Sequence, residues 1–409
     1  FVTAVGNGTA IITAEAGPAK ATCTVTVSTY STGGGSSSGG SSGSGNKTET
    51  TTNPDGSTTT TVTKPDGSTT ETTKNPDGST EVVNTDKTGN VTTTTTDTAG
   101  NKTETVEKPD GTSEPTVTNK DGSASTTTVD ETGKTEAQVK LPDAVVNNAA
   151  DKGEAVALPM PAVSATTDTE TAPAVTVSLT GSSTSAKVEI PVADVTPGTV
   201  AVIVKADGTE EIIKTSLTTE NGVAVTLSDG DTVKIVDNTK DFVDVSDSYW
   251  GSDEIAFAAS RELFNGTSAT TFSPETDMNR AMIITVLARY EGVDTTGGDT
   301  WYDQAVTWAK DNGVSDGSNL DASLTREQLA TMLYRYAQYK GYDTSVGGMS
   351  LAEYTDADQI SSYATTAMQW VNENGLITGV TDTTLDPKGS ATRAQGATIL
   401  MRFCENITA

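Results

Sequence analysis

The sequence predicts a multidomain chain in which a β-hairpin, a low-complexity stalk of threonine-rich repeats and a small β-sandwich precede an all-α unit of three repeats. Three observations predict this order. Glycine recurs every 11 residues from 45 to 133, apolar residues alternate at period two between 155 and 240, and helical periodicity begins at 242. Because only 33% of the residues are hydrophobic, the core must be concentrated in part of the chain.

The composition excludes several classes of function. The 409 residues carry a formal charge of −29, which disfavours nucleic acid and anionic membranes as partners. No apolar run approaches the ~20 residues of a transmembrane helix. The absence of histidine removes Ser-His-Asp and Cys-His catalysis and the commonest metal ligand. We therefore expect no enzyme activity, no cofactor and no metal site, since the many acids also form no recognisable glycosidase signature.

The cysteines and the first residues bear on the cellular compartment. Cys23 and Cys404 lie in segments that we assign to separate domains, so we expect two free core thiols and no disulfide. Residues 1–3 show neither the basic nor the apolar region of a signal peptide. We expect an export signal and a passenger domain upstream of Phe1.

Residues 1–29 predict a β-hairpin, followed by a linker. Two strands, at 8–14 and 21–27, are separated by Gly17-Pro18, a turn-forming pair. The pattern resembles the closing hairpin of bacterial Ig-like domains of group 2, of which it would be a C-terminal remnant. Residues 30–46 are mostly glycine and serine and predict a flexible linker.

Residues 47–140 form an 11-residue repeat that we interpret as a stalk. Most repeat glycines end a turn-forming sequence such as Asn53-Pro54-Asp55-Gly56, in which proline presets φ and glycine accepts a positive φ. The intervening threonines favour strands, but neither face is apolar. Two alternatives remain open. The first is a row of polar hairpins, with or without O-glycosylation, and the second is a disordered linker.

Residues 141–240 predict a small β-sandwich that serves as a spacer. Apolar residues alternate at 175–179, 186–192, 200–204 and 223–227, and Asp-Gly turns follow at 207–208 and 229–230. A fold of this kind does not imply a function, and an adhesive role is the alternative to a spacer.

Residues 241–409 contain a threefold repeat, divided at 241–296, 297–345 and 346–409. The repeats align through Asn279-Arg280, Thr325-Arg326 and Thr392-Arg393, each followed seven residues later by Leu287, Leu333 and Leu400. Their first helices align through Phe257, Trp308 and Trp370, with Trp250, Trp301 and Tyr363 seven residues earlier. Between the helices stand loops that end in Gly266, Gly317 and Gly379.

These motifs resemble the S-layer homology family, and repeat one keeps its Phe-x-Pro motif as Phe272-Ser273-Pro274. The resemblance implies a pseudo-threefold α-helical unit whose three grooves bind pyruvylated secondary wall polymers. Repeat two has five fewer residues between its loop glycine and its arginine. We therefore expect its groove to be altered.

The candidate polysaccharide-binding residues are Arg280, Arg326, Arg393, Trp250, Trp301, Gly266, Gly317 and Gly379. The arginines fall in the first turn of a helix, where a cation opposes the helix dipole. We expect each guanidinium and the free N–H groups of that turn to bind a carboxylate. The alternative is that each arginine pairs with a local acid, such as Asp277, Asp321 or Asp386, and only fixes the loop.

Other repeated side chains have a structural interpretation. Arg289, Arg335 and Arg402 lie near helix C-termini, where the dipole favours cations, so we expect a structural role. Trp308 and Trp370 share an apolar helix face with alanines and predict core positions, whereas Trp250 and Trp301 precede or begin their helices and predict contact positions.

The predicted function is non-covalent anchoring of an exported surface protein to an anionic, pyruvylated cell-wall polysaccharide linked to peptidoglycan. The expected location is extracellular, at the cell wall or S-layer surface, with further S-layer or host-surface contacts. The alternative is a surface adhesin whose Ig-like and β-sandwich segments bind host or neighbouring cells.

Overall fold

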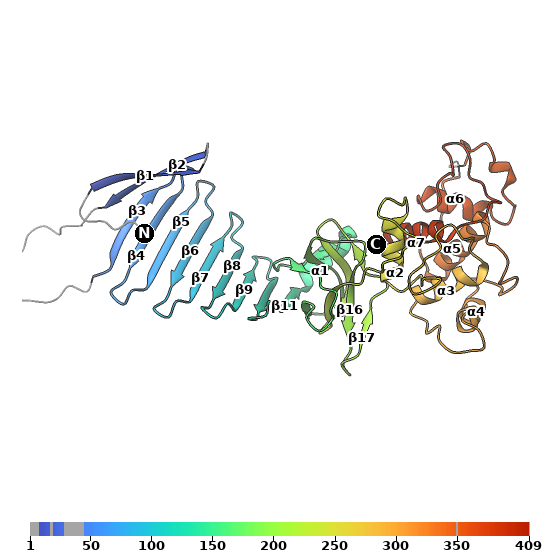
Figure 1. Ribbon diagram of the computed structural model, residues 1–409, viewed down its shortest axis with the longest axis horizontal. Helices are drawn as coiled ribbons and strands as arrows, with labels where there is room; N and C mark the ends of the chain where they lie inside the picture. The colour runs from blue at the N-terminus through green and yellow to red at the C-terminus, as the bar shows by residue number, and fades with distance from the viewer. Residues whose placement is uncertain (1–7, 17–18, 28–44, 349–350, 409) are drawn as a thin grey trace, which may run out of the picture. The chain divides into compact units, whose positions relative to one another are not determined.

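The computed structural model describes residues 8–16, 19–27, 45–348 and 351–408 (Figure 1). The chain divides into two compact units. One holds residues 1–162, 173–187 and 227–232, and the other holds residues 163–172, 188–226 and 233–409. In the described part of the chain, no helix combines the length and apolar character that crossing a membrane requires.

The predicted N-terminal hairpin is confirmed. Strands β1 (Gly8–Ala16) and β2 (Ala19–Val27) pair antiparallel, with Ala16 opposite Ala19. The predicted turn at 17–18, most of the linker and the Cys23 side chain lie outside the described residues. The resemblance to an Ig-like domain stays a prediction.

The stalk repeats form a row of hairpins, as the first alternative expects, and their O-glycosylation stays a prediction. Each strand pairs antiparallel with the next along the chain (Figure 1). The strands are β3 (Lys47–Thr52), β4 (Thr58–Thr63), β5 (Thr69–Lys74), β6 (Thr80–Thr85), β7 (Val91–Thr96), β8 (Lys102–Glu107), β9 (Ser113–Thr118), β10 (Ala124–Val129) and β11 (Thr135–Pro142).

The turns of the stalk explain the 11-residue period. In the first turn, Gly56 N–H donates to Asn53 O at 3.0 Å, and Gly56 has a φ of 85°. The Asp55 carboxylate accepts from the backbone N–H and hydroxyl of Ser57 at 2.9 and 2.7 Å. Positive φ recurs at every repeat glycine from Gly56 to Gly133, and each turn therefore uses glycine for its backbone geometry.

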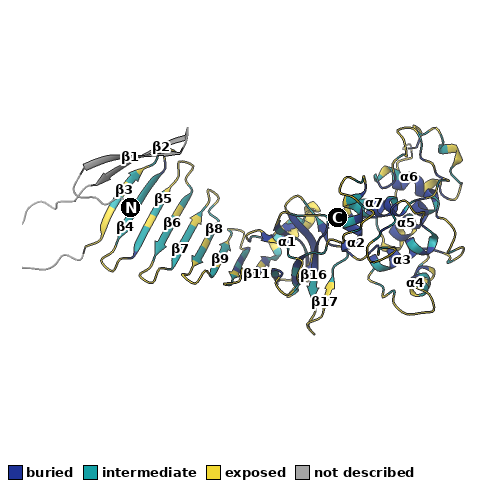
Figure 2. Ribbon diagram, in the orientation of Figure 1, coloured by how far each residue is buried: buried dark blue, intermediate teal, exposed yellow. Residues whose placement is uncertain are grey.

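The stalk has little hydrophobic core. Its strands are mostly half-buried or exposed, whereas buried residues dominate many of the other elements (Figure 2). Cross-strand threonine pairs, such as Thr59 and Thr73 with hydroxyls 2.9 Å apart, line the sheet. Main-chain ladders and capped turns therefore hold this segment together.

A helix that the sequence reading missed follows the stalk. Helix α1 (Asp143–Lys152) ends at Gly153, whose φ is 71°. Asp143 accepts from the backbone N–H groups of Ser182 and Ser183 at 2.6 and 2.9 Å. Strand β11 pairs parallel with β14 (Ala174–Thr180), and the predicted boundary at 140–141 falls within β11. An aspartate at the start and a glycine at the end were the available helix signals.

The strands predicted between 155 and 240 are present. They are β12 (Val156–Ala157), β13 (Val163–Ser164), β15 (Ser185–Ala193), β16 (Thr199–Val204), β17 (Glu210–Ile212), β18 (Leu217–Thr218), β19 (Gly222–Ser228) and β20 (Thr232–Asp237). In the second unit, β16 pairs antiparallel with β17, β18 pairs antiparallel with β19, and β13 pairs parallel with β15. The alternating residues Val188, Ile190 and Val192 are buried, as their period predicts.

The C-terminal part of the second unit is helical. It contains α2 (Ser252–Ser260), α3 (Arg280–Tyr290), α4 (Asp303–Asp311), α5 (Arg326–Lys340), a short 3-10 helix (Ala357–Gln359), α6 (Thr365–Glu373) and α7 (Arg393–Ile407). Helix α3 packs against α4, α5 against α6, and α7 against α2. The second helix of each repeat therefore packs against the first helix of the next, and the last repeat packs against the first.

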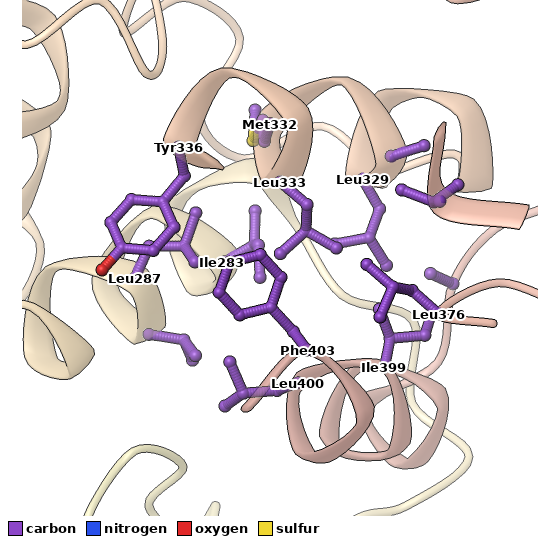
Figure 3. Close-up of a cluster of buried hydrophobic side chains, with 14 of the residues drawn as sticks. Ile283, Leu287, Leu329, Met332, Leu333, Tyr336, Leu376, Ile399, Leu400 and Phe403 are labelled. Carbon is purple, nitrogen blue, oxygen red and sulfur yellow. The ribbon is translucent and has the colours of Figure 1, made fainter. Parts of the chain in front are cut away.

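The second helices share one core. Tyr336 and Phe403 point into it with ring centroids 5.7 Å apart, beside Leu333 and Leu400 (Figure 3). Trp370 is completely buried, which confirms its predicted core position, and Trp308 is half-buried against the same cluster. Cys404 is a free buried thiol, as predicted, and burial raises its pKa to about 12.

Candidate functional site

The three second helices begin around a closed ring of backbone hydrogen bonds. Met278 N–H donates to Ala391 O, Leu324 N–H to Met278 O, and Ala391 N–H to Leu324 O, at 2.8, 2.8 and 2.9 Å. Each of these residues stands two positions before one of the repeated arginines. The ring therefore places Arg280, Arg326 and Arg393 in equivalent positions about the pseudo-threefold axis.

The predicted helix caps are present. Thr325 and Thr392 form capping boxes with Gln328 and Gln395. Asn279 accepts from Met282 N–H at 2.9 Å and forms no box, as expected.

The expectation that first-turn N–H groups are free to bind an anion is wrong. Arg326 N–H donates to Gly389 O and Arg393 N–H donates to Thr276 O, both at 2.9 Å, while Arg280 N–H donates to Ala322 O at 3.3 Å. Each acceptor belongs to the loop of a neighbouring repeat. Because these donors already have protein acceptors, the helix starts serve repeat-to-repeat packing.

The guanidinium groups of Arg326 and Arg393 also hold neighbouring loops. Arg393 donates from Nε to Phe272 O at 2.8 Å and from Nη2 to Asn265 O at 2.7 Å. Arg326 donates from Nε to Leu385 O and from Nη2 to Thr378 O, both at 2.8 Å. Both arginines therefore fix a loop, but the expected pairing with a local acid is wrong, because their partners are carbonyl oxygens.

Both arginines keep donors for a further partner. A guanidinium has five N–H donors, of which these bonds use two. Arg326 and Arg393 are only 5% and 6% exposed. Nη1 of neither group is among the buried, unpaired atoms of the described chain, so its N–H donors reach solvent. The two side chains can bind an acceptor without releasing their loops.

Two aspartates hold the same loops from their N–H side. Asp244 accepts from Phe272 and Ser273 N–H at 2.8 and 2.7 Å, and Asp356 makes the equivalent bonds in repeat three. Burial works to raise the pKa of Asp244, but these N–H bonds outweigh it and lower that pKa below its usual value. The loops are thus rigid before any ligand binds.

Two cavities with equivalent linings lie between the repeats. The first, which we call groove 1, has a volume of about 420 Å³ and is lined by Asn265, Gly266, Arg289, Trp301 and Arg393. The second, groove 3, has a volume of about 340 Å³ and is lined by Thr378, Gly379, Arg402, Trp250 and Arg326. Each groove therefore combines a loop and helix of one repeat, the tryptophan of a second and the loop-fixing arginine of the third.

The tryptophans of the grooves are accessible. Trp250 is 56% exposed and Trp301 is 50% exposed, which agrees with their prediction as contact positions. Such exposure is unusual for a large aromatic ring, and it leaves a flat apolar face beside each arginine.

The candidate glycines shape the loops. A Cβ atom at Gly266 would lie 2.4 Å from Ser268 O, and one at Gly379 would lie 2.0 Å from Thr381 O. Gly317 is needed for a different reason, because its φ of 68° lies in the left-handed region that favours glycine. We conclude that these glycines act through loop geometry.

The equivalent position in repeat two, groove 2, differs. Arg280 donates from Nε to Ser318 O, and its Nη2 forms an ion pair with Asp316 at 2.9 Å. Asp316 stands at the place of Asn265 and Thr378, which present a backbone carbonyl instead. The shortened loop of repeat two therefore supplies a carboxylate to the arginine of repeat one, and the expected alteration of this groove is present.

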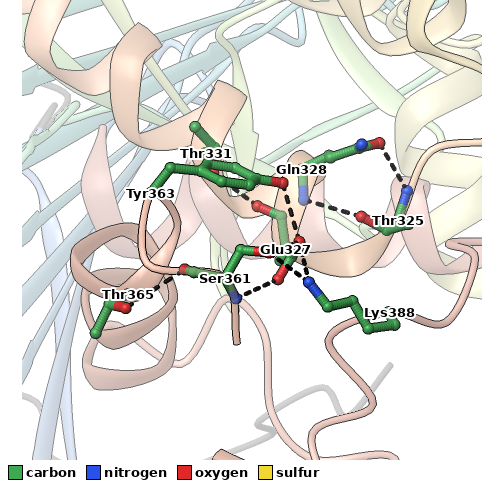
Figure 4. Close-up of polar contacts among 8 residues, drawn as sticks. All are labelled: Thr325, Glu327, Gln328, Thr331, Ser361, Tyr363, Thr365 and Lys388. Carbon is green, nitrogen blue, oxygen red and sulfur yellow. Dashed lines mark hydrogen bonds and ion pairs between the residues drawn. The ribbon is translucent and has the colours of Figure 1, made fainter. Parts of the chain in front are cut away.

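The aromatic residue of groove 2 is also hydrogen-bonded to a side chain of the protein. Tyr363, at the place of Trp250 and Trp301, donates its hydroxyl to Glu327 at 3.0 Å (Figure 4). Glu327 is 3% exposed and also accepts from Ser361 N–H at 2.9 Å and Lys388 Nζ at 2.7 Å. Burial, together with the Glu327 carboxylate, raises the pKa of Tyr363 to about 12.

Sequence reasoning underestimated Arg289 and Arg402. Both line grooves, although their position near helix ends predicted a structural role. Arg289 Nη1 donates to Leu263 O at 3.2 Å, so it also supports its loop. The available signal was their recurrence nine residues after Arg280 and Arg393, at the same position of the second helix.

The comparison with protein families matches two regions. The model of the S-layer homology domain matches residues 241–281 and 353–397. These cover most of repeats one and three, including the groove loops at 263–267 and 376–380 but not Arg289, Trp301, Arg326 or Arg402. The region predicted as repeat two has the same helix order and ring contacts, although the match does not include it.

Several curated relatives match part of this chain. An endoglucanase of Bacillus sp. (strain KSM-635) is 29% identical over 43% of this chain and 20% of its own length. Exoglucanase XynX of Acetivibrio thermocellus is 31% identical over 40% of this chain and 16% of its own. The Surface-layer 125 kDa protein of Lysinibacillus sphaericus is 24% identical over 36% of this chain and 13% of its own. The chain thus spans a fifth or less of these relatives.

Proposed function

We propose that this chain, whose C-terminal region carries S-layer homology domains, holds an exported protein to the cell wall by binding an anionic, pyruvylated wall polysaccharide. S-layer homology domains associate proteins with the cell surface, and the likeness to a surface-layer protein agrees with that location. The polymer class and the binding residues are the parts that we propose.

The composition of grooves 1 and 3 carries the proposal. Each groove offers an exposed tryptophan face, on which the C–H surface of a sugar ring can stack. Each also offers two arginines with donors that suit a carboxylate. A saccharide with a carboxylate substituent requires these two features side by side.

The rest of the chain serves as a spacer in this proposal. The stalk hairpins and the strands between 141 and 240 separate the anchor from a passenger, and the chain itself performs no catalysis. Two of the relatives have names that describe glucanases, which makes a polysaccharide-degrading enzyme one class of passenger. The adhesin alternative rests on the same strands and stays a prediction.

Sedimentation with wall sacculi tests the proposal. We expect the full chain to co-sediment with sacculi that carry the polymer, and to stay in solution after the polymer is extracted. Selective removal of pyruvate by mild acid should abolish most of the binding, because the arginines lose their anionic partner. Equal binding to extracted sacculi would contradict anchoring by this polymer, and equal binding after pyruvate removal would contradict the anionic group.

A further inference from the structure

A larger cavity adjoins groove 1. It has a volume of about 690 Å³, within the range of ordinary ligand sites. One wall comes from the strand-rich part of the second unit at 188–226 and 233–240, which we call the β-segment, and it includes Glu211, Lys214 and Lys240. The other wall comes from repeat one and includes Arg289 and the segment 294–296. We call this cavity the lysine cleft.

The two walls of the lysine cleft are fixed to each other. Arg261, at the end of α2, is fully buried and donates from Nε to Ser216 O at 2.7 Å. It also donates to the carbonyls of Pro197 and Thr199 at 3.0 and 3.2 Å. Leu217 of the β-segment belongs to the same hydrophobic core as the helices. The cleft is therefore a built feature of one compact unit.

The lysine cleft is continuous with groove 1. Phe264, Asn265, Gly266 and Arg289 line both cavities. The loop that Arg393 holds thus forms the edge between them. A linear polymer that lies across this edge can contact both cavities.

The cleft offers cations to a ligand. In a chain with 26 lysines and arginines among 409 residues, Lys214, Lys240 and Arg289 gather in this cavity. None of the ion pairs between described residues uses either lysine. Lys240 is exposed and donates from Nζ to Asn238 Oδ1 at 2.7 Å, which uses one of its three N–H donors, and Lys214 is half-buried.

Two of the three acids of the cleft, Glu211 and Asp294, have partners of their own, and the third, Glu262, opposes through its charge the lowering of the Arg289 pKa by burial. Glu211 forms an ion pair with Lys205, which lies outside the cleft. Asp294 accepts from the backbone N–H and hydroxyl of Thr296 at 2.8 and 2.6 Å. Side chains such as Asn265, Ser268 and Thr295 add hydrogen-bonding groups for hydroxyls. Together these groups suit a hydroxylated, negatively charged ligand.

We propose that the polysaccharide bound in groove 1 continues over the loop at 264–266 into the lysine cleft, where Lys214 and Lys240 bind the next acidic saccharide unit. This inference rests on the proposed function. It makes the β-segment a part of the binding surface, in contrast to its predicted role as a spacer alone.

Fragment length tests this inference. The probes are size-fractionated fragments of pyruvylated wall polymer, one of a single repeating unit and one of several units, titrated into the full chain. The double variant Lys214→Gln/Lys240→Gln should bind the long fragment about tenfold more weakly at groove 1, which corresponds to about 1.4 kcal/mol, while binding at groove 3 stays as in the wild type. It should bind the short fragment as the wild type does, because groove 1 is unchanged.

The control removes the same charge elsewhere. Lys140→Gln/Lys152→Gln changes two exposed lysines that line neither cavity and should leave both affinities unchanged. Wild-type affinity of the lysine double variant for the long fragment would overturn the cleft and leave the anchor intact. Equal weakening of both fragments, or an equal effect of the control, would overturn it too, because the lysines would then act through general charge. Failure of the wild type to bind either fragment would overturn the anchoring function itself.

Discussion

Groove 2 differs from grooves 1 and 3 although all three occupy equivalent places in one pseudo-threefold ring. In grooves 1 and 3 the loop-fixing arginine bonds only backbone carbonyls and stands beside an exposed tryptophan. In groove 2 Arg280 pairs with Asp316, and Tyr363 is bonded to Glu327. The difference shows that the ring of backbone hydrogen bonds can be retained in a repeat whose arginine and aromatic side chain are already bonded to acids of the protein.

The cause lies in the loop. A carbonyl oxygen satisfies one donor of a guanidinium without neutralising it, so the cation still attracts an anion. The Asp316 carboxylate supplies both the hydrogen bond and the opposite charge. It occupies the role that a ligand carboxylate would take. We therefore infer that grooves 1 and 3 bind the polymer and that groove 2 serves the scaffold.

The largest expected difference between the grooves concerns the arginines. Arg393→Ala and Arg326→Ala should each lower the free energy of unfolding by about 2–4 kcal/mol, because two buried carbonyl groups lose their donor. Arg280→Ala should cost about 1 kcal/mol, because its Asp316 partner is largely exposed. Chemical denaturation of the full chain, followed by tryptophan fluorescence, measures both.

This prediction revises the simplest reading of the sequence. A helix-capping argument alone implies that Arg393→Ala leaves the fold intact, since Thr392 and Gln395 still form the capping box. The loop contacts imply the opposite. Equal stabilities of the three alanine variants would show that the arginine contacts contribute alike and would remove the basis for separating groove 2.

Local and repeated features were predictable from the sequence. The capping boxes depend on residues three positions apart, and the exposed tryptophans precede recognisable helices, so both could be predicted from spacing. The partners of the arginines could not. Arg393 contacts Phe272 and Asn265, which lie more than one hundred residues away along the chain, and only the closed ring brings them together.

Elements with weak hydrophobic patterning were also beyond prediction. The stalk strands have no apolar face, so period alone could not separate hairpins from disorder. Helix α1 is short and contains adjacent valines, Val145 and Val146, which favour strands as readily as helices. Its Asp143 contacts Ser182 and Ser183, a tertiary stabilisation that local sequence does not reveal.

A smaller difference is expected between the two groove tryptophans and Tyr363. Trp250→Ala and Trp301→Ala should each weaken polymer binding about tenfold, because a stacked ring contributes about 1 kcal/mol or more, and both should leave the melting temperature nearly unchanged. Tyr363→Ala should do the reverse, since it loses a bond to the buried Glu327 but no ligand contact. Isothermal titration and thermal melts of the same variants provide the two readouts.

The smallest expected effect is a gain in groove 2. The pKa of Asp316 is lowered below its usual range, chiefly by hydrogen bonds from Ser318 and with a further contribution from Arg280, so the carboxylate is ionised at neutral pH. At neutral pH it therefore neutralises Arg280. Asp316→Asn gives groove 2 the residue that groove 1 has at 265 and removes this charge.

We expect Asp316→Asn to raise the stoichiometry for short polymer fragments from two per chain to three, measured by isothermal titration. The new site should be weaker than the others, because the single ring of Tyr363, although 55% exposed, is smaller than the indole of a tryptophan. Asp321→Asn is the matched control, since it removes the same charge from an exposed residue of the same repeat. A wild-type stoichiometry of three would show that Arg280 binds ligand despite Asp316. An unchanged stoichiometry of two in Asp316→Asn would instead place the block in the Tyr363 and Glu327 contacts, and Tyr363→Trp in the same background would then be the change that opens groove 2.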